Sequence, residues 1–144
     1  MERTGREIVL HYTVQNGDIL AAGKASCELK RILQQIGIQS DIIRRITVSS
    51  YEAEMNVALH SHGGQMTVSI SPARTEIAVE DEGPGIDDID SALQAGFSTA
   101  PEAVRSQGFG GGMGLPNIIR CSDQFDIHSV KGEGTTIRIT VEHF

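Results

Sequence analysis

The chain has 144 residues, of which 39% are hydrophobic and 22% charged, and its formal net charge is -7. A chain of this length buries roughly two thirds of the surface that its unfolded form exposes, so we expect one domain over residues 1–144 with a core that requires no metal or disulfide. This composition excludes a disordered chain, a membrane span of roughly 18 apolar residues and, by its acidity, a typical nucleic-acid-binding surface.

The N-terminal segment and the cysteines predict a cytoplasmic protein. The opening sequence MERTGREIVLHY contains no apolar region of the kind found in a signal peptide. Cys27 and Cys121 form no Cys-x-x-Cys pair, so neither a zinc site nor a disulfide framework is indicated. We expect both to be small core residues.

The first half of the chain predicts one strand followed by two helices. Residues 7–14 alternate between apolar and polar side chains, as a strand does. An apolar stripe that includes Cys27 predicts a helix over 18–36. Ser40 or Asp41 can cap a second helix, which is expected to end at His62-Gly63-Gly64.

The second half predicts four strands and one more helix, with a long loop before that helix. The strands are expected at 65–70, 75–80, 124–129 and 135–141, and the helix at 115–121. Residues 81–114 are predicted to be mostly loop, with one short helix near 87–94, and so long a loop is usually functional. This element order favours a two-layer α/β (α+β) sandwich over a doubly wound fold, in which strands and helices alternate regularly.

Four polar residues share one face of the second predicted helix: Ser49, Glu52, Asn56 and His60. A solvated face is the simpler interpretation. The functional interpretation is that Asn56 offers an amide oxygen to Mg²⁺, while Glu52, one turn earlier, orients or deprotonates an attacking hydroxyl. His60 and His62 lie at the end of the helix without a third ligand, so we do not assign them to a metal site.

Asp81 follows the strand predicted at 75–80 and begins the segment Asp81-Glu82-Gly83-Pro84-Gly85-Ile86. An ordinary turn explains Gly-Pro-Gly on its own. The functional interpretation is that the Asp81 carboxylate accepts a hydrogen bond from an amino group such as that of adenine. Glycines at 83 and 85 would let a flat ring approach the backbone, because they carry no Cβ.

The glycine-rich segment 108–114 runs directly into a predicted helix with Pro116 in its first turn. Free N–H groups and the helix dipole at such a terminus favour phosphate. The segment is not a Rossmann fingerprint, since Met113 replaces the last glycine, and Gly23-Lys24-Ala25 lacks the other residues of a Walker loop. Nucleotide binding without either loop indicates a different architecture.

Taken together, these short motifs resemble those of the GHKL ATPase superfamily, whose members share the Bergerat nucleotide-binding fold. The resemblance covers about residues 40–140 and depends on the order of four short motifs. They are Glu52-x-x-x-Asn56, Asp81-x-Gly83-x-Gly85, Gly112-x-Gly114-Leu115 and Gly134-Thr135-Thr136. The resemblance implies a histidine-kinase-like ATPase domain with a mixed sheet and a mobile ATP lid.

The resemblance also implies a role for each motif. Glu52 would be the general base, Asn56 the Mg²⁺ ligand and Asp81 the reader of adenine, with Thr135 or Thr136 supporting that contact. The segment 97–114 would be the lid over the phosphates. The implied contacts to ATP are Asn56, Asp81, Gly83, Gly85, Ile86, Thr99, Arg105, Gly110, Gly111, Gly112, Met113, Gly114, Leu115, Thr135 and Thr136.

Within this superfamily, residues 112–120 are most similar to the bacterial anti-sigma-factor and switch serine/threonine kinases of partner-switching systems. Those proteins use ATP and Mg²⁺ to phosphorylate a STAS-domain partner. The chain departs from their pattern at Ala100, where several members carry a lysine, and Arg105 is the candidate replacement. Neither nucleic acid nor a membrane is an expected partner, and both a monomer and a homodimer remain open.

Three other functions remain open. The protein could sequester a sigma factor in a nucleotide-dependent way, with the first helix as the contact surface through Lys24, Lys30 and Arg31. It could also bind ATP without transferring phosphate. A histidine-kinase catalytic domain is less favoured, because only about 40 residues precede the Glu52 helix, where a dimerising helical hairpin would normally lie.

Overall fold

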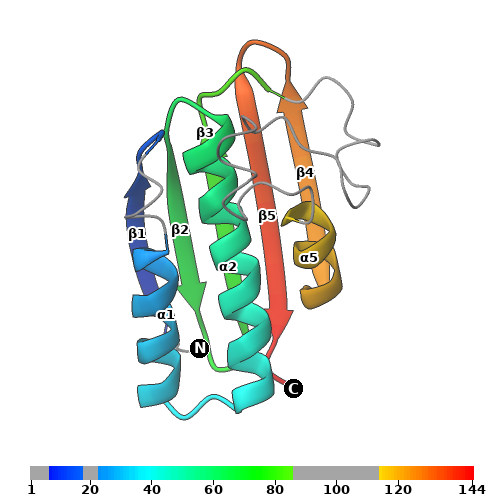
Figure 1. The fold of residues 1–144 in the computed structure, drawn as a ribbon. Coiled ribbons are helices and arrows are strands. Elements are labelled where there is room, and N and C mark those ends of the chain that lie inside the picture. Colours follow the sequence, from blue (N-terminus) through cyan, green and yellow to red (C-terminus); the bar gives the residue numbers. More distant parts are fainter. Residues whose placement is uncertain (1–6, 18–22, 86–113) are drawn as a thin grey trace.

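A computed structural model describes residues 7–17, 23–85 and 114–144 (Figure 1). Every strand and helix that the sequence predicts within these ranges is present. The elements are β1 (Ile8–Val14), α1 (Lys24–Gln35), α2 (Ser40–His60), β2 (Gly64–Ile70), β3 (Arg74–Asp81), α5 (Gly114–Cys121), β4 (Gln124–Val130) and β5 (Gly134–Glu142). The helix expected near 87–94, and with it the lid, lies outside the described residues.

The five strands form one sheet in the order β1-β2-β3-β5-β4, and each neighbouring pair is antiparallel. The expectation of a mixed sheet is therefore wrong for the described strands. Two helices connect β1 to β2 along the chain. A single helix between neighbouring strands usually makes them parallel, whereas the second helix reverses the chain direction again and β2 runs antiparallel to β1. β3 and β4, which precede and follow α5 along the chain, run in the same direction. They do not pair, because β5 lies between them in the sheet.

All three described helices cover the same face of the sheet, which confirms the two-layer sandwich (Figure 1). Alternate residues of each inner strand point into the layer between sheet and helices, as the pleat requires. In β5 these residues are Thr135, Ile137, Ile139 and Val141, all of them buried. Leu29 and Leu33 of α1, Ile46 of α2 and Ile118 of α5 meet them from the other side.

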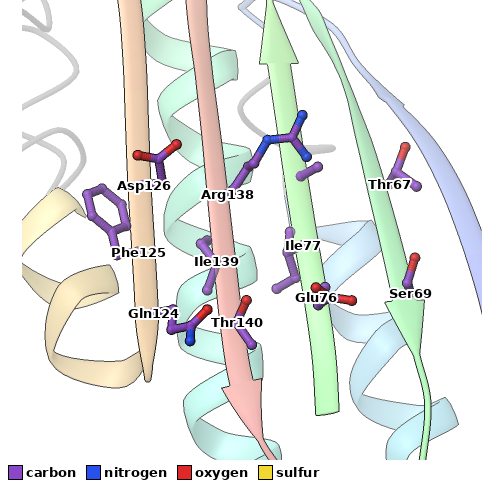
Figure 2. Close-up of a pocket in the computed structure, with 11 residues that line it drawn as sticks. Thr67, Ser69, Glu76, Ile77, Gln124, Phe125, Asp126, Arg138, Ile139 and Thr140 are labelled. Carbon is purple, nitrogen blue, oxygen red and sulfur yellow. The ribbon is translucent and has the colours of Figure 1, made fainter.

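The opposite face of the sheet carries polar side chains, some of which line a hollow (Figure 2). Thr67, Ser69, Glu76, Arg138 and Thr140 line it from three strands. The face covered by the helices is therefore apolar and buried, whereas the opposite, open face carries mainly polar side chains. In the described ranges, no helix combines the length and apolarity that crossing a membrane demands.

The N-terminus of α2 differs from the expectation. Ser40 and Asp41 both lie inside the helix, and the capping position is Gln39, whose side chain makes no capping hydrogen bond. Gly37, with a φ of 85°, closes α1 so tightly that the chain enters α2 almost at once. Asp41 instead places its charge in the first helical turn, where the helix dipole favours it.

The cysteines also differ from the expectation, because Cys27 is exposed and Cys121 is only half-buried. The buried stripe of α1 consists of Ala25, Ser26, Leu29 and Leu33, so Cys27 points outward. A carboxylate fixes this rotation of the helix, since Glu54 of α2 is 3% exposed and accepts three hydrogen bonds from the start of α1. The donors are Ala25 N–H at 3.3 Å, Ser26 N–H at 3.3 Å and Ser26 Oγ at 2.8 Å.

Replacing Glu54 is expected to destabilise the fold. Glu54→Ala leaves two buried N–H groups and a hydroxyl without their acceptor, and we expect the free energy of unfolding to fall by about 3 kcal/mol. Urea denaturation followed by circular dichroism measures the loss. Glu76→Ala is the matched control, because it removes an exposed carboxylate from the open face. Equal stability of the two variants would contradict the role of Glu54 as the acceptor that holds the start of α1.

Candidate functional site

Glu52 and Asn56 are half-buried on α2 and lie against the first residue of α5. A Cβ added to Gly114 would be 3.2 Å from Asn56 Oδ1 and 3.6 Å from Glu52 Oε1. The absence of a side chain at position 114 therefore leaves space in front of both polar groups. This face of α2 is not a simple solvated face, since Ser49 on the same face is fully buried.

The Glu52 carboxylate is held by a residue that the sequence analysis did not single out. Asn117 Nδ2 donates a hydrogen bond of 2.9 Å to Glu52 Oε2. Arg120, one turn further along α5, donates from Nη2 to Asn117 Oδ1. One feature of the sequence could have indicated Asn117 as a site residue. It follows Gly114 by three residues, near the start of a helix that comes directly after a glycine-rich segment.

Tyr51 lies beside Glu52 in the sequence of α2 and extends toward Gly23 at the start of α1. A Cβ on Gly23 would be 3.1 Å from the Tyr51 ring. Burial raises the pKa of the Tyr51 phenol, and the negative charges of Glu52 and Glu54 raise it further. The phenol therefore keeps its proton at neutral pH and acts at most as a hydrogen-bonding group.

Asp81 ends β3 and ties that strand to the beginning of β5. Its Oδ1 accepts the N–H of Gly83 at 2.9 Å and the N–H of Thr135 at 3.1 Å. Among the described residues no group donates a hydrogen bond to Oδ2. One oxygen thus fixes the carboxylate, and the other is available to a ligand.

The glycines around Asp81 are required by close approach of the backbone. A Cβ on Gly83 would be 2.7 Å from the Ser61 Cβ, and one on Gly134 would collide with the Asp81 carbonyl oxygen. Gly134 also has a φ of 130°, which L side chains rarely adopt. Gly85 lies against the β4–β5 turn, where Gly132 N–H donates to the carbonyl of Pro84 at 2.8 Å.

The two threonines of β5 point to opposite faces of the sheet. Thr135 is buried on the helix side, and its hydroxyl lies 2.8 Å from Ser129 Oγ. Thr136 shares the open face with Arg138 and Thr140, since successive side chains of a strand alternate. Only Thr135 therefore lies on the same side as Asp81.

The structure places Glu52 and Asn56 of α2 against the N-terminus of α5, and it places Asp81 at the end of β3, where Gly83 packs on Ser61 just after α2. Leu115 is buried beneath the first turn of α5. His62 is exposed, and the described residues contain no group of three or more His, Cys, Asp or Glu side chains that could hold a metal. The remaining predicted ATP contacts lie outside the described residues and stay predictions: Ile86, Thr99, Arg105, Gly110, Gly111, Gly112 and Met113.

The arrangement fits a nucleotide with a divalent cation. Within the described part of the chain, the Asn56 amide has no hydrogen-bond partner, and Gly114 leaves its oxygen uncovered. An uncovered amide oxygen is a suitable ligand for Mg²⁺, which completes its shell with water and phosphate oxygens. The N-terminus of α5 begins beside that oxygen, so its free N–H groups lie where phosphates would be bound.

Comparisons with known proteins give matches over most of the chain. The family model described as "Histidine kinase-, DNA gyrase B-, and HSP90-like ATPase" matches residues 34–143. The serine/threonine-protein kinase RsbT of Bacillus subtilis (strain 168) is 34% identical over 125 residues, which cover 84% of this chain and 86% of that protein. The anti-sigma F factor of Thermoanaerobacter sp. (strain X514) is 34% identical over 103 residues, or 68% of each chain.

A solved structure supports the same fold. The crystal structure of the RsbU and RsbW domains of Rv1364c from Mycobacterium tuberculosis matches with a TM-score of 0.62. The match covers 93% of this chain and 32% of the solved chain, at 19% sequence identity. At that identity the likeness concerns the fold alone.

Proposed function

Because the chain belongs to the histidine kinase-, DNA gyrase B- and HSP90-like (GHKL) ATPase family, in the group that includes RsbT and the anti-sigma F factors, we propose that it is an ATP-dependent protein serine/threonine kinase. Its substrate would be a STAS-domain protein in a bacterial partner-switching system. The observation that carries this proposal is the position of Glu52 and Asn56 directly against the N-terminus of α5. We also place the activity in the cytoplasm, where ATP is available.

In the proposed reaction, Glu52 acts as general base toward a serine or threonine hydroxyl of the partner. The hydroxyl oxygen forms a bond to the γ-phosphorus, the bond from that phosphorus to the β,γ-bridging oxygen breaks, and ADP leaves. The hydroxyl proton passes to the Glu52 carboxylate. Such a transfer requires chiefly positioning and charge stabilisation, which an acidic chain supplies through local backbone N–H groups rather than through a basic surface.

The described residues divide the binding of ATP and Mg²⁺ between two ends of the site. Asn56 would hold Mg²⁺, which neutralises phosphate charge when bound. Asp81 Oδ2 would accept the adenine amino group, while Gly83 and Gly85 let the segment after Asp81 pack against Ser61 and the β4–β5 turn rather than opening space for the ring. Thr135 supports Asp81 through its N–H, and the N-terminus of α5 at Gly114 and Leu115 faces the phosphates.

Asn56→Ala is expected to weaken the binding of ATP in the presence of Mg²⁺ by about 10-fold or more, because one metal ligand is lost. Binding of ATP in EDTA is expected to change much less. Isothermal titration calorimetry in both buffers measures the two affinities. A loss of the same size with and without Mg²⁺ would rule out Asn56 as the metal ligand.

The proposed activity is tested directly by transfer of labelled phosphate. The purified protein is used to capture partners from a lysate of its own host, and each captured protein is incubated with the kinase, [γ-³²P]ATP and Mg²⁺. We expect label on a serine or threonine of a STAS-domain protein. If that protein binds the chain with ATP present and stays unlabelled, the kinase proposal fails and a binding module remains.

A second candidate function is sequestration of a sigma factor. The anti-sigma F relatives favour it, and α1 presents Lys24, Lys30 and Arg31 as exposed basic residues on an otherwise acidic chain. The same capture experiment separates the two functions, since a sigma factor recovered only in the presence of nucleotide supports sequestration. Nothing in this second function requires Glu52 as a base.

A further inference from the structure

We propose that Asn117 is a positioning residue that holds one oxygen of the Glu52 carboxylate and so aims the other at the reacting hydroxyl. The proposal rests on the proposed function, in which Glu52 is the general base. It assigns to α5 a role in catalysis that is separate from binding phosphate at its N-terminus.

The hydrogen bonds on Asn117 determine which way its amide points. Arg120 carries only donors, so it faces the carbonyl oxygen Oδ1 of Asn117. The amide nitrogen is then turned toward Glu52, where it donates to Oε2 at 2.9 Å. The orientation that suits Arg120 is thus the one that Glu52 requires, because an ionised carboxylate only accepts.

The two oxygens of the Glu52 carboxylate have different surroundings. Oε2 is occupied by Asn117, whereas Oε1 lies on the side of Gly114 and Asn56, 3.6 Å from the position that a Cβ on Gly114 would take. The space left by Gly114 is therefore in front of Oε1. Asn117 anchors one oxygen, and the other lies beside the glycine that begins α5.

The anchor is itself fixed in place by packing. Leu115 and Ile118, on either side of Asn117 in α5, are buried against the core. At the other end of the helix, Arg45 of α2 donates from Nε to the carbonyl oxygen of Cys121 at 2.9 Å. The burial of Leu115 and Ile118 and the hydrogen bond from Arg45 thus hold α5 against α2 on both sides of Asn117 in the sequence.

Asn117→Leu tests the assignment, because leucine is similar in size and cannot donate a hydrogen bond. We expect the rate of phosphoryl transfer to the STAS-domain substrate to fall about 10- to 100-fold, the effect typical of a misplaced catalytic group. The affinity for ATP and the melting temperature are expected to stay near those of the unmodified protein. Ile119→Ala is the matched control on α5, since Ile119 is 40% exposed and has no polar group.

A double variant distinguishes positioning from a general structural effect. In a Glu52→Gln background, Asn117→Leu is expected to cause no further loss of rate, because the group that it positions no longer acts as a base. An equal fold-loss in both backgrounds would overturn the proposal. So would a wild-type transfer rate in Asn117→Leu alone.

A spectroscopic measurement tests the contact without any turnover. The side-chain amide ¹H–¹⁵N signals of Asn117 are expected to move upfield in Glu52→Ala, which removes the acceptor. Unchanged signals would overturn the proposal even if the kinase activity is real. Conversely, if Glu52→Gln retains full activity, the proposed function of Glu52 fails, and the positioning role falls with it even if the signals move.

Discussion

Glu52→Gln is expected to lower the rate of phosphoryl transfer by about 10²- to 10⁴-fold, the contribution typical of a general base. The amide keeps the size of the carboxylate and can still accept the hydrogen bond from Asn117, but it cannot take the hydroxyl proton. The affinity for ATP is expected to change less than about two-fold, because Glu52 acts on the attacking hydroxyl rather than on the nucleotide. Single-turnover transfer of labelled phosphate and calorimetry measure the two quantities.

Glu76→Gln is the control for this variant, since it neutralises an exposed carboxylate on the face of the sheet opposite the helices (Figure 2). It is expected to transfer phosphate at the unmodified rate. Transfer by Glu52→Gln at a rate close to that of the control would show that another group accepts the proton.

Asp81→Asn is expected to lower the affinity for ATP by about 100-fold or more without unfolding the protein. The asparagine oxygen can replace Oδ1 and keep the hydrogen bonds from Gly83 and Thr135. Its NH₂ group would then stand where Oδ2 stands, and a donor would face the amino group of adenine. Loss of a hydrogen bond to a charged group costs about 1.5–3 kcal/mol, and two opposed donors add to this loss.

Calorimetry with ATP and with a nucleotide that lacks the adenine amino group, inosine triphosphate, tests the Asp81 assignment. Asp81→Asn should weaken ATP strongly and inosine triphosphate much less. Glu82→Gln is the matched control, because Glu82 is the exposed neighbour of Asp81. Equal losses for the two nucleotides would mean that Asp81 does not read the amino group.

Sequence periodicity located the described strands and helices because each buries one regular face. The sequence motifs also placed Glu52 and Asn56 on the helix that carries them, and they placed Asp81 one residue beyond the strand that it in fact ends, since each motif is local. Asn117 was missed because its partner is 65 residues away in the sequence. That contact depends on how α5 packs on α2, which no short pattern contains.

Two of the errors in the described residues, the place of Cys27 and the mixed sheet, arise from contacts between distant parts of the chain. Cys27 was expected in the core because an apolar stripe can be drawn through it, but the buried position belongs to Ser26, which bonds to Glu54. A mixed sheet was expected by analogy, whereas the insertion of β5 between β3 and β4 makes every described pairing antiparallel. For Cys27 a tertiary contact overrode the local pattern, and for the sheet the pairing of distant strands differs from the one that the resemblance implied.

The three attachments of α2 have a mechanical consequence. Glu54 is tied to the start of α1, Glu52 to Asn117 of α5, and Arg45 to the last turn of α5. These contacts join α2 to α1 on one side and to α5 on the other. Rotation of α2 about its axis would therefore break the hydrogen bonds to at least one of the two helices. We therefore expect the backbone amides near 50–57 to be among the slowest in the chain to exchange with deuterium. In these terms α2 is a rigid helix whose orientation is fixed by the two helices that flank it.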